Sequence, residues 1–152
     1  MKSLFLLALA FAGVSLADDK DDWPRIEIES PNADLKLKVV CETSDASPLW
    51  HQILTAADEI DEYKNQESGC SNDNGVESKC TKVEEDPDEG ARISLCGSQQ
   101  ATNCAIVSAL ARGIVDKCAD GGDRAGGWGE WEYKENGDWV DGGSTVSIER
   151  RF

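Results

Sequence analysis

Six cysteines constrain this chain more than any other feature of its 152 residues. Their number is even, and no two are spaced as the C-x-x-C pair that is typical of zinc sites. His51 is the only histidine, so a zinc site would lack the close ligand pairs that it needs. We therefore predict three disulfides and no metal or other cofactor. The cysteines are Cys41, Cys70, Cys80, Cys96, Cys104 and Cys118.

The N-terminal segment predicts an oxidising destination for these cysteines. Lys2 precedes an apolar run over residues 4–14, and the small residues Ser15 and Ala17 complete a pattern that signal peptidase accepts. The run is shorter than the roughly 20 residues of a membrane-spanning helix, and acidic residues follow it at once. We predict a secreted, extracellular protein with a signal peptide over 1–17, an acidic flexible leader over 18–24 and one disulfide-stapled domain over 25–152.

The acidic balance of the chain narrows the choice of partners. Asp and Glu number 30 against 15 Lys and Arg, which gives a net charge of −15. This charge repels phosphate groups, so it argues against nucleic acid and against anionic lipid surfaces. It fits either plain solubility in an extracellular fluid or a basic partner. We expect a monomer, without a membrane span in its mature form, that binds an extracellular protein or glycan.

Hydrophobic alternation predicts three strands. Residues 25–29 and 35–41 place apolar side chains at alternate positions, and the Pro-Asn-Ala-Asp segment at 31–34 predicts the turn between them. Residues 92–96 repeat the pattern as a short third strand. The polar stretch over 68–90 is interpreted as a long connection, which its two cysteines would pin to the rest of the fold.

Two amphipathic helices are predicted. Ser47 and Pro48 have the character of an N-cap and a first helical position, and apolar residues then recur at spacings of three and four. The second helix runs from Cys104 to Cys118 after a cap at position 102 or 103. Its two cysteines lie ~21 Å apart along the axis, too far to bond each other. Each end of this helix must therefore be joined to a different element.

The C-terminal part predicts a hairpin and completes the fold class. Asn136-Gly137 is the strongest short hairpin signal, and apolar and aromatic residues flank it on both sides. Residues 145–149 alternate as a last strand. The order strand, helix, strand, helix, hairpin predicts an α+β fold. It is a two-layer α/β sandwich in which two helices pack on one face of a mainly antiparallel sheet, with three disulfides.

No catalytic grouping stands out in the sequence. With six cysteines paired, no thiol nucleophile remains, and no G-x-S-x-G motif accompanies the single histidine. Most acidic residues occur in runs, which is typical of solvated surface. Thirty acids make a suitably spaced carboxylate pair uninformative for glycoside hydrolysis. We predict a non-enzymatic protein.

Three of the five tryptophans gather around the predicted hairpin: Trp128, Trp131 and Trp139. Exposed aromatic rings on strands can stack on sugar rings, so the three residues form a candidate binding surface. The competing interpretation places Trp131 and Tyr133 in the core and Trp128 over an edge of the sheet. The two interpretations both stay open at this point.

The order of cysteines and elements resembles that of small secreted fungal proteins of the killer-toxin-like and necrosis-inducing-effector kind. Over residues 37–149, a cysteine ends the strand at 37–41, a helix follows, and the segment 90–96 ends in another cysteine. A cysteine-bounded helix, introduced by Asn103, then precedes a glycine-rich turn and a closing hairpin. The resemblance implies a compact α/β sandwich, export, and action on other cells by binding.

The resemblance also implies a disulfide pairing and a function. It pairs Cys41 with Cys118, Cys70 with Cys104, and Cys80 with Cys96. Killer toxins of this kind are typically basic and act at membranes or channels, whereas this chain is acidic, so only the cysteines carry over. We predict a secreted effector or toxin-like virulence protein that binds a host or competitor target without catalysis. Two alternatives stay open: a small secreted hydrolase or carbohydrate-binding protein that uses acidic and Trp residues, and an acidic inhibitor of basic host proteins.

Overall fold

The structure is a computed structural model that describes residues 23–63, 69–74, 80–86, 90–97, 101–119 and 121–150. The predicted signal peptide over 1–17, and the predicted leader as far as residue 22, lie outside the described residues. Trp23 and Pro24, the last two residues of that leader, are exposed and belong to no helix or strand.

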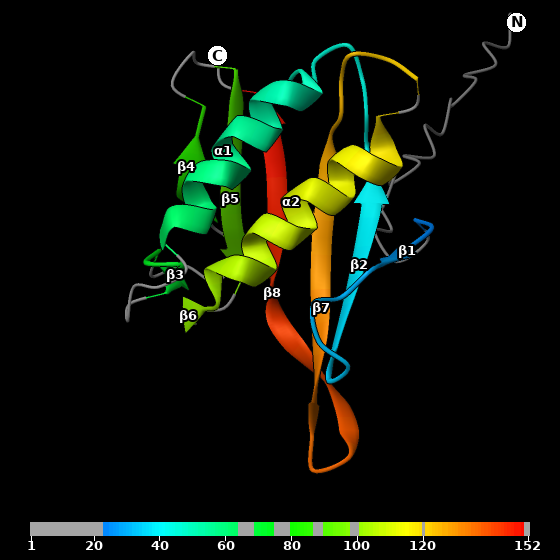
Figure 1. Ribbon diagram of the computed structural model, residues 1–152, viewed down its shortest axis with the longest axis vertical. Coiled ribbons are helices and arrows are strands. Elements are labelled where there is room, and N and C mark those ends of the chain that lie inside the picture. The colour runs from blue at the N-terminus through cyan, green and yellow to red at the C-terminus, as the bar shows by residue number, and fades with distance from the viewer. Residues whose placement is uncertain are drawn as a thin grey trace, which may run out of the picture.

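A six-stranded antiparallel sheet forms one layer of the fold (Figure 1). Its strand order is β1-β2-β7-β8-β5-β4. The strands are β1 (Ile26–Ile28), β2 (Leu35–Cys41), β4 (Cys80–Glu85), β5 (Ala91–Gly97), β7 (Gly127–Glu135) and β8 (Asp138–Arg150). Two short strands, β3 (Cys70–Ser71) and β6 (Ala101–Thr102), pair with each other outside this sheet.

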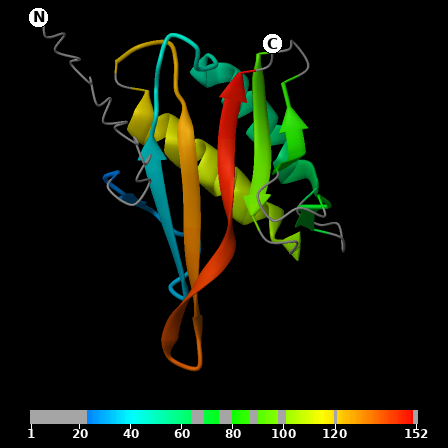
Figure 2. The same cartoon turned by 180° about the vertical axis from the view of Figure 1, so that it is seen from behind.

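Two helices form the second layer. These helices, α1 (Trp50–Tyr63) and α2 (Cys104–Cys118), lie side by side over one face of the sheet. Figure 2, seen from behind, shows the strands in front of both helices, so no described helix covers the other face. This arrangement confirms the predicted two-layer α/β sandwich.

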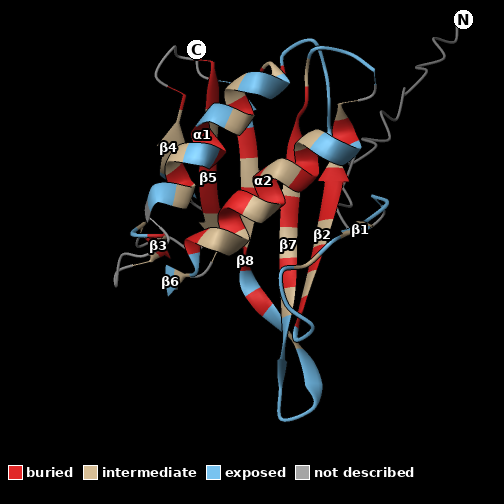
Figure 3. Cartoon of the chain, in the orientation of Figure 1, coloured by how far each residue is buried: buried red, intermediate tan, exposed pale blue. Residues whose placement is uncertain are grey.

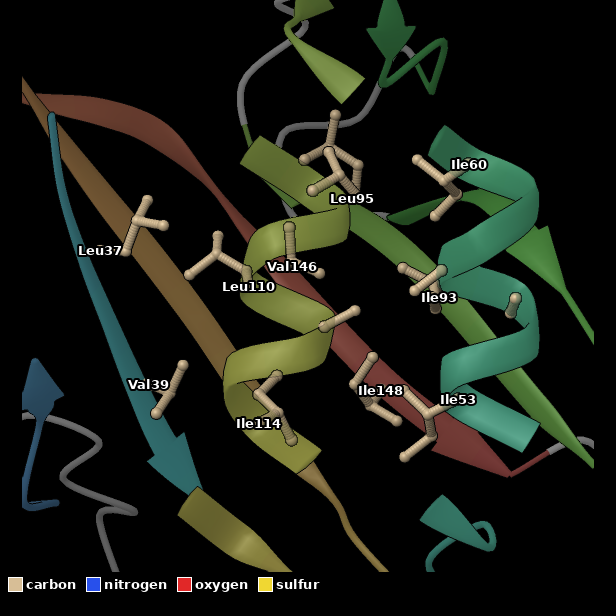
Figure 4. Close-up of a cluster of buried hydrophobic side chains, with 14 of the residues drawn as sticks. Leu37, Val39, Ile53, Ile60, Ile93, Leu95, Leu110, Ile114, Val146 and Ile148 are labelled. Atoms are coloured by element: carbon tan, nitrogen blue, oxygen red, sulfur yellow. The ribbon is translucent and has the colours of Figure 1, made fainter. Parts of the chain in front are cut away.

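Apolar side chains from both layers meet between the helices and the sheet (Figure 4). Because alternate residues of a strand point to opposite faces, the inner strands β2, β5 and β8 contribute alternate residues to this core. Full burial of one such side chain stabilises the fold by roughly 1.5–3 kcal/mol. The core includes Leu37, Val39, Ile53, Ile60, Ile93, Leu95, Leu110, Ile114, Val146 and Ile148.

The first helix begins later than the sequence predicted. The backbone of Leu49 bridges to Arg124, and the main-chain N–H of Trp50 donates to Asp123. The hydroxyl of Ser47 accepts from the N–H of Ser44 instead of capping the helix. The prediction of Ser47 as N-cap is therefore wrong, because the chain at 48–49 is held against the segment at 123–125 before it turns into α1.

Three disulfides cross-link the fold, and Cys41–Cys118 is the one that joins a helix to the six-stranded sheet. Their pairs are Cys41–Cys118, Cys70–Cys104 and Cys80–Cys96, which is the pairing that the resemblance implied. The two ends of α2 are joined to different elements, as its length required, because Cys104 bonds a residue of β3 and Cys118 bonds a residue of β2.

The closing hairpin extends beyond the helices. Asn136 and Gly137 have positive φ angles of 52° and 99°, which confirms the predicted Asn-Gly turn. The register of β7 against β8 shifts between Glu130 and Glu132, and Gly143 on the facing strand also has a positive φ. This irregularity bends β8, and the hairpin beyond it is mostly exposed, as the pale blue tip in Figure 3 shows.

Candidate functional site

The sheet surface opposite the helices is the broadest candidate site, and we call it the open face. Its residues alternate along each strand with those that enter the core. The pairing of β2, β7, β8 and β5 places them in rows across four strands. The open face contains Lys36, Lys38, Val40, Arg92, Ser94, Trp128, Glu130, Glu132, Lys134, Trp139, Asp141, Thr145 and Ser147.

Ion pairs neutralise much of the charge on the open face. The Nε atom of Arg25 lies 2.7 Å from a carboxylate oxygen of Glu130, and the Nζ atom of Lys38 lies 2.6 Å from one of Glu132. Both pairs are partly exposed, so each contributes about 0–1 kcal/mol to stability. Their main effect is that these four charges already have partners within the molecule.

Trp139 and two lysines break this pattern of pairing. The Nζ atom of Lys36 lies 4.1 Å from the centroid of the Trp139 ring system, and that of Lys134 lies 5.9 Å from it. Neither lysine has a carboxylate within 4.0 Å among the described residues, and Trp139 is 38% exposed. We call Lys36, Lys134 and Trp139 the aromatic–lysine cluster. It joins an apolar ring to two positive charges that have no acidic partner in the described chain.

Trp128 lies on the same face but has a structural role. Its indole N–H donates to Glu42 at 3.0 Å, and the guanidinium of Arg25 lies 5.9 Å from its ring. Trp128 pairs across the strands with Val40, which is only 1% exposed although it points away from the helices. Since six residues of strand separate Trp128 from Lys134, it lies about 20 Å from the aromatic–lysine cluster. Trp128 is therefore held as a cover over Val40.

Trp131 points to the opposite face of β7. It pairs with Leu37, belongs to the core cluster and is 5% exposed. Tyr133 points to the same side but is 40% exposed. The structure thus divides the three tryptophans: Trp128 and Trp139 share the open face, and Trp131 is separated from both by the sheet.

A cluster of carboxylates lies between α1 and β4. Partial burial and the negative charges of Glu84, Glu62 and Asp86 raise the pKa of Glu59 above its ordinary 4.5. Asp86 is itself 3% exposed, and its Oδ2 atom has no hydrogen-bond partner in the described part of the chain. Glu59 consequently repels its neighbours when it is ionised.

Replacement of Glu59 by Gln is expected to stabilise the fold at pH 7. Because the folded state holds the proton more tightly than the unfolded state, folding stability falls as pH rises from about 4.5 through the raised pKa. The advantage of Glu59→Gln over wild type should therefore shrink as pH falls from the raised pKa to about 4.5 and be absent below it. Denaturant unfolding at pH 4 and pH 7 measures this difference. The control is Glu29→Gln, an exposed residue without an ion pair in the described structure, and an equal effect of both variants would contradict the assignment.

The residues considered for catalysis do not come together. His51 is exposed on α1, where its ring lies edge-on to Trp50 at 5.7 Å between centroids, and no described side chain hydrogen-bonds to its imidazole ring. No group of three His, Cys, Asp or Glu side chains suited to a metal ion occurs within the described ranges. In those same ranges, no helix combines the length and the apolar character needed to cross a membrane.

The fold and the open face define a small α+β sandwich, stapled by three disulfides, with one sheet surface uncovered by its described helices. Comparison of the chain with models of protein families, with curated proteins and with solved structures found no match. The function is therefore inferred from the side chains of this chain alone.

Sequence reasoning found only part of the aromatic–lysine cluster. Trp139 was among the candidate binding residues, and the alternation over 35–41 already placed Lys36 away from the core. Lys134 carried no signal of its own, because its position beside Trp139 depends on the turn at 136–137 and its position near Lys36 depends on the pairing of β2 with β7.

Proposed function

We propose that this chain is a secreted binding protein of the effector or toxin-like kind, which binds a protein on the surface of a host or competitor cell. It acts without catalysis. The aromatic–lysine cluster, formed by the projecting β7–β8 hairpin and the start of β2, is the observation that carries this proposal. The three disulfides support export, because such bonds persist in oxidising compartments.

The cluster has the composition of a binding hot spot. Tryptophan is enriched at the energetic centres of protein interfaces, where its large ring excludes water from neighbouring contacts. Trp139 is exposed at the end of the molecule that the helices leave uncovered. Lys36 and Lys134, without carboxylates in the described chain, offer positive charge to acidic groups of a partner. Binding through this cluster thus supplies an apolar contact and a charged one together.

Binding of labelled protein to intact plant cells and to intact yeast cells tests this function. Saturable binding to one of them is expected, and Trp139→Ala should weaken it by roughly 30-fold, the effect of losing about 2 kcal/mol at a hot spot. Lys36→Ala combined with Lys134→Ala should weaken it less, and added salt should reduce the contribution of the two lysines.

Trp50→Ala provides the matched control. Trp50 lies on α1 and is 39% exposed, against 38% for Trp139, so its removal takes away the same type of ring at the same exposure. It should leave cell binding unchanged. Equal binding by the Trp139→Ala variant and wild type, or the absence of saturable binding to either cell type, would contradict the proposed function.

A further inference from the structure

A cavity of about 280 Å³ opens between the first turn of α2 and the β7–β8 hairpin. It lies on the helix side of the sheet, and β7 separates it from the open face. Its apolar walls come from Leu35, Ile106, Trp131 and Tyr133. The other residues that line it include Thr102, Asn103, Gly142 and Ser144.

The lining of the cavity carries no ionisable acid or base apart from the phenol of Tyr133. This is unusual in a chain of which 30% is Asp, Glu, Lys or Arg. A charged ligand entering the cavity would give up part of its hydration without gaining an opposite charge, which is unfavourable. The cavity therefore selects an uncharged ligand.

The indole N–H of Trp131 is an unused hydrogen-bond donor at this cavity. Trp131 is 5% exposed and lines the cavity, and within the described ranges its Nε1 atom has no acceptor. Gly142 lies directly beside it, since a Cβ atom there would stand 2.1 Å from Nε1. Glycine at 142 thus leaves room for the ring and its donor at the cavity wall.

Asn103 supplies a second donor at the rim. Its Oδ1 atom accepts from the main-chain N–H of Ala105 at 2.9 Å and so caps α2. This bond fixes the orientation of the side-chain amide and leaves its Nδ2 group without an acceptor in the described chain. The cavity therefore presents two N–H donors beside an aromatic and aliphatic wall.

We propose that this cavity binds one ring of a neutral carbohydrate. A pyranose ring has an apolar C–H face that packs on aromatic side chains and hydroxyl oxygens that accept from N–H donors, which is the combination that Trp131, Tyr133 and Asn103 present. The volume lies just below the roughly 300 Å³ at which typical ligand pockets begin, so it suits a single ring. The site is distinct from the aromatic–lysine cluster and extends beyond the proposed function.

Titration of the ¹⁵N-labelled protein with defined saccharides tests the site through the indole N–H resonances. The probes are cellotriose, mannotriose, xylotriose and N,N′,N″-triacetylchitotriose, with trigalacturonic acid as the charged counterpart. A neutral probe should shift the Trp131 resonance saturably, and the charged probe should bind more weakly. Tyr133→Ala should weaken binding by roughly tenfold, whereas Tyr133→Phe keeps the ring and should bind as wild type does.

Asn103→Asp tests the donor without removing the helix cap. The aspartate keeps an oxygen for the N–H of Ala105 but loses the Nδ2 donor, so the fold should persist while affinity for the neutral probe falls. Trp139→Ala should leave the titration unchanged, which separates this site from the one proposed for cell binding. Any of three results overturns the proposal: no saturable Trp131 shift with any neutral probe, equal affinity for trigalacturonic acid, or wild-type affinity in both Tyr133→Ala and Asn103→Asp.

Discussion

Replacement of Cys41 and Cys118 by serine is expected to lower the free energy of unfolding by about 4.5 kcal/mol. The bond closes a sequence separation of 77 residues, the largest among the three disulfides. In the chain-entropy description, a longer closed loop restricts the unfolded chain more, so its loss costs more stability. A domain of this size has a total stability of about 5–15 kcal/mol, so this single change removes a large part of it.

The position of the bond in the fold reinforces this expectation. Cys41 ends β2 and Cys118 ends α2, so the disulfide holds the C-terminal turn of the helix on the sheet. Nearby, the hydroxyl of Thr43 donates to the main-chain oxygen of Cys118 at 2.8 Å. Loss of the covalent link leaves this contact and the packing of α2 to hold the same end of the helix.

Replacement of Cys80 and Cys96 by serine is the matched control. This disulfide spans 16 residues and joins paired residues of β4 and β5, so its loss should cost only about 3 kcal/mol. Denaturant unfolding of both double variants, followed by circular dichroism, measures the difference. A greater loss of stability in the β4–β5 variant would show that local strain or packing outweighs the restriction of the unfolded chain.

The second helix and the hairpin could be predicted because strong local signals defined them. The predicted range of α2 agrees with the structure, and its buried residues Val107, Leu110 and Ile114 follow the spacing of one helix face. The Asn-Gly pair similarly defined the turn between β7 and β8. In each case the information lies within a few residues, so no knowledge of distant partners is needed.

The strand β4 could not be predicted in the same way. It lies inside the polar stretch over 68–90, and Val83 is its only apolar residue apart from Cys80, so no hydrophobic alternation marks it. Main-chain pairing with β5 and the Cys80–Cys96 bond define it instead. The pairing and the disulfide both join β4 to residues of β5, and the sequence does not specify the path of the chain between these two strands. The register shift near Val83 further interrupts any regular pattern.

The candidate site shows the same division between local and distant information. Alternation alone predicts that Trp128 and Trp131 lie on opposite faces of the sheet. They are three residues apart on one strand, and successive side chains of a strand point to opposite faces. The contacts of each tryptophan depend on residues that are distant in the sequence or on a neighbouring strand. The indole N–H of Trp128 donates to Glu42, the ring of Trp131 packs beside Gly142, and Lys36 lies over the ring of Trp139. The sequence could therefore identify the three tryptophans as candidates. It could not show that Trp128 covers the sheet, that Trp131 lines a cavity and that Trp139 is exposed for contact with a partner.

The role of Gly127 likewise depends on a strand that is distant in the sequence. Its replacement by alanine should lower the free energy of unfolding by about 3 kcal/mol or more. Gly127 begins β7 with a φ of 150°, and a Cβ atom there would lie 2.1 Å from the main-chain oxygen of Val40. Both sides of this contact are backbone within paired strands, so neither relaxes without disturbing the sheet. The methyl group must therefore displace the start of β7 from the end of β2.

Gly122→Ala is the control for Gly127→Ala. It shows whether the loss of stability comes from the close contact at position 127 or from replacing any glycine in this stretch. Gly122 lies only five residues away in the same glycine-rich stretch, yet nothing stands within 4 Å of a Cβ atom there and its φ is not in the left-handed region. Alanine at 122 should be neutral or stabilise the fold by up to about 1 kcal/mol, because it restricts the unfolded chain. Thermal and denaturant unfolding compare the two variants. Similar stability in both would mean that β7 approaches β2 less closely than the structure has it.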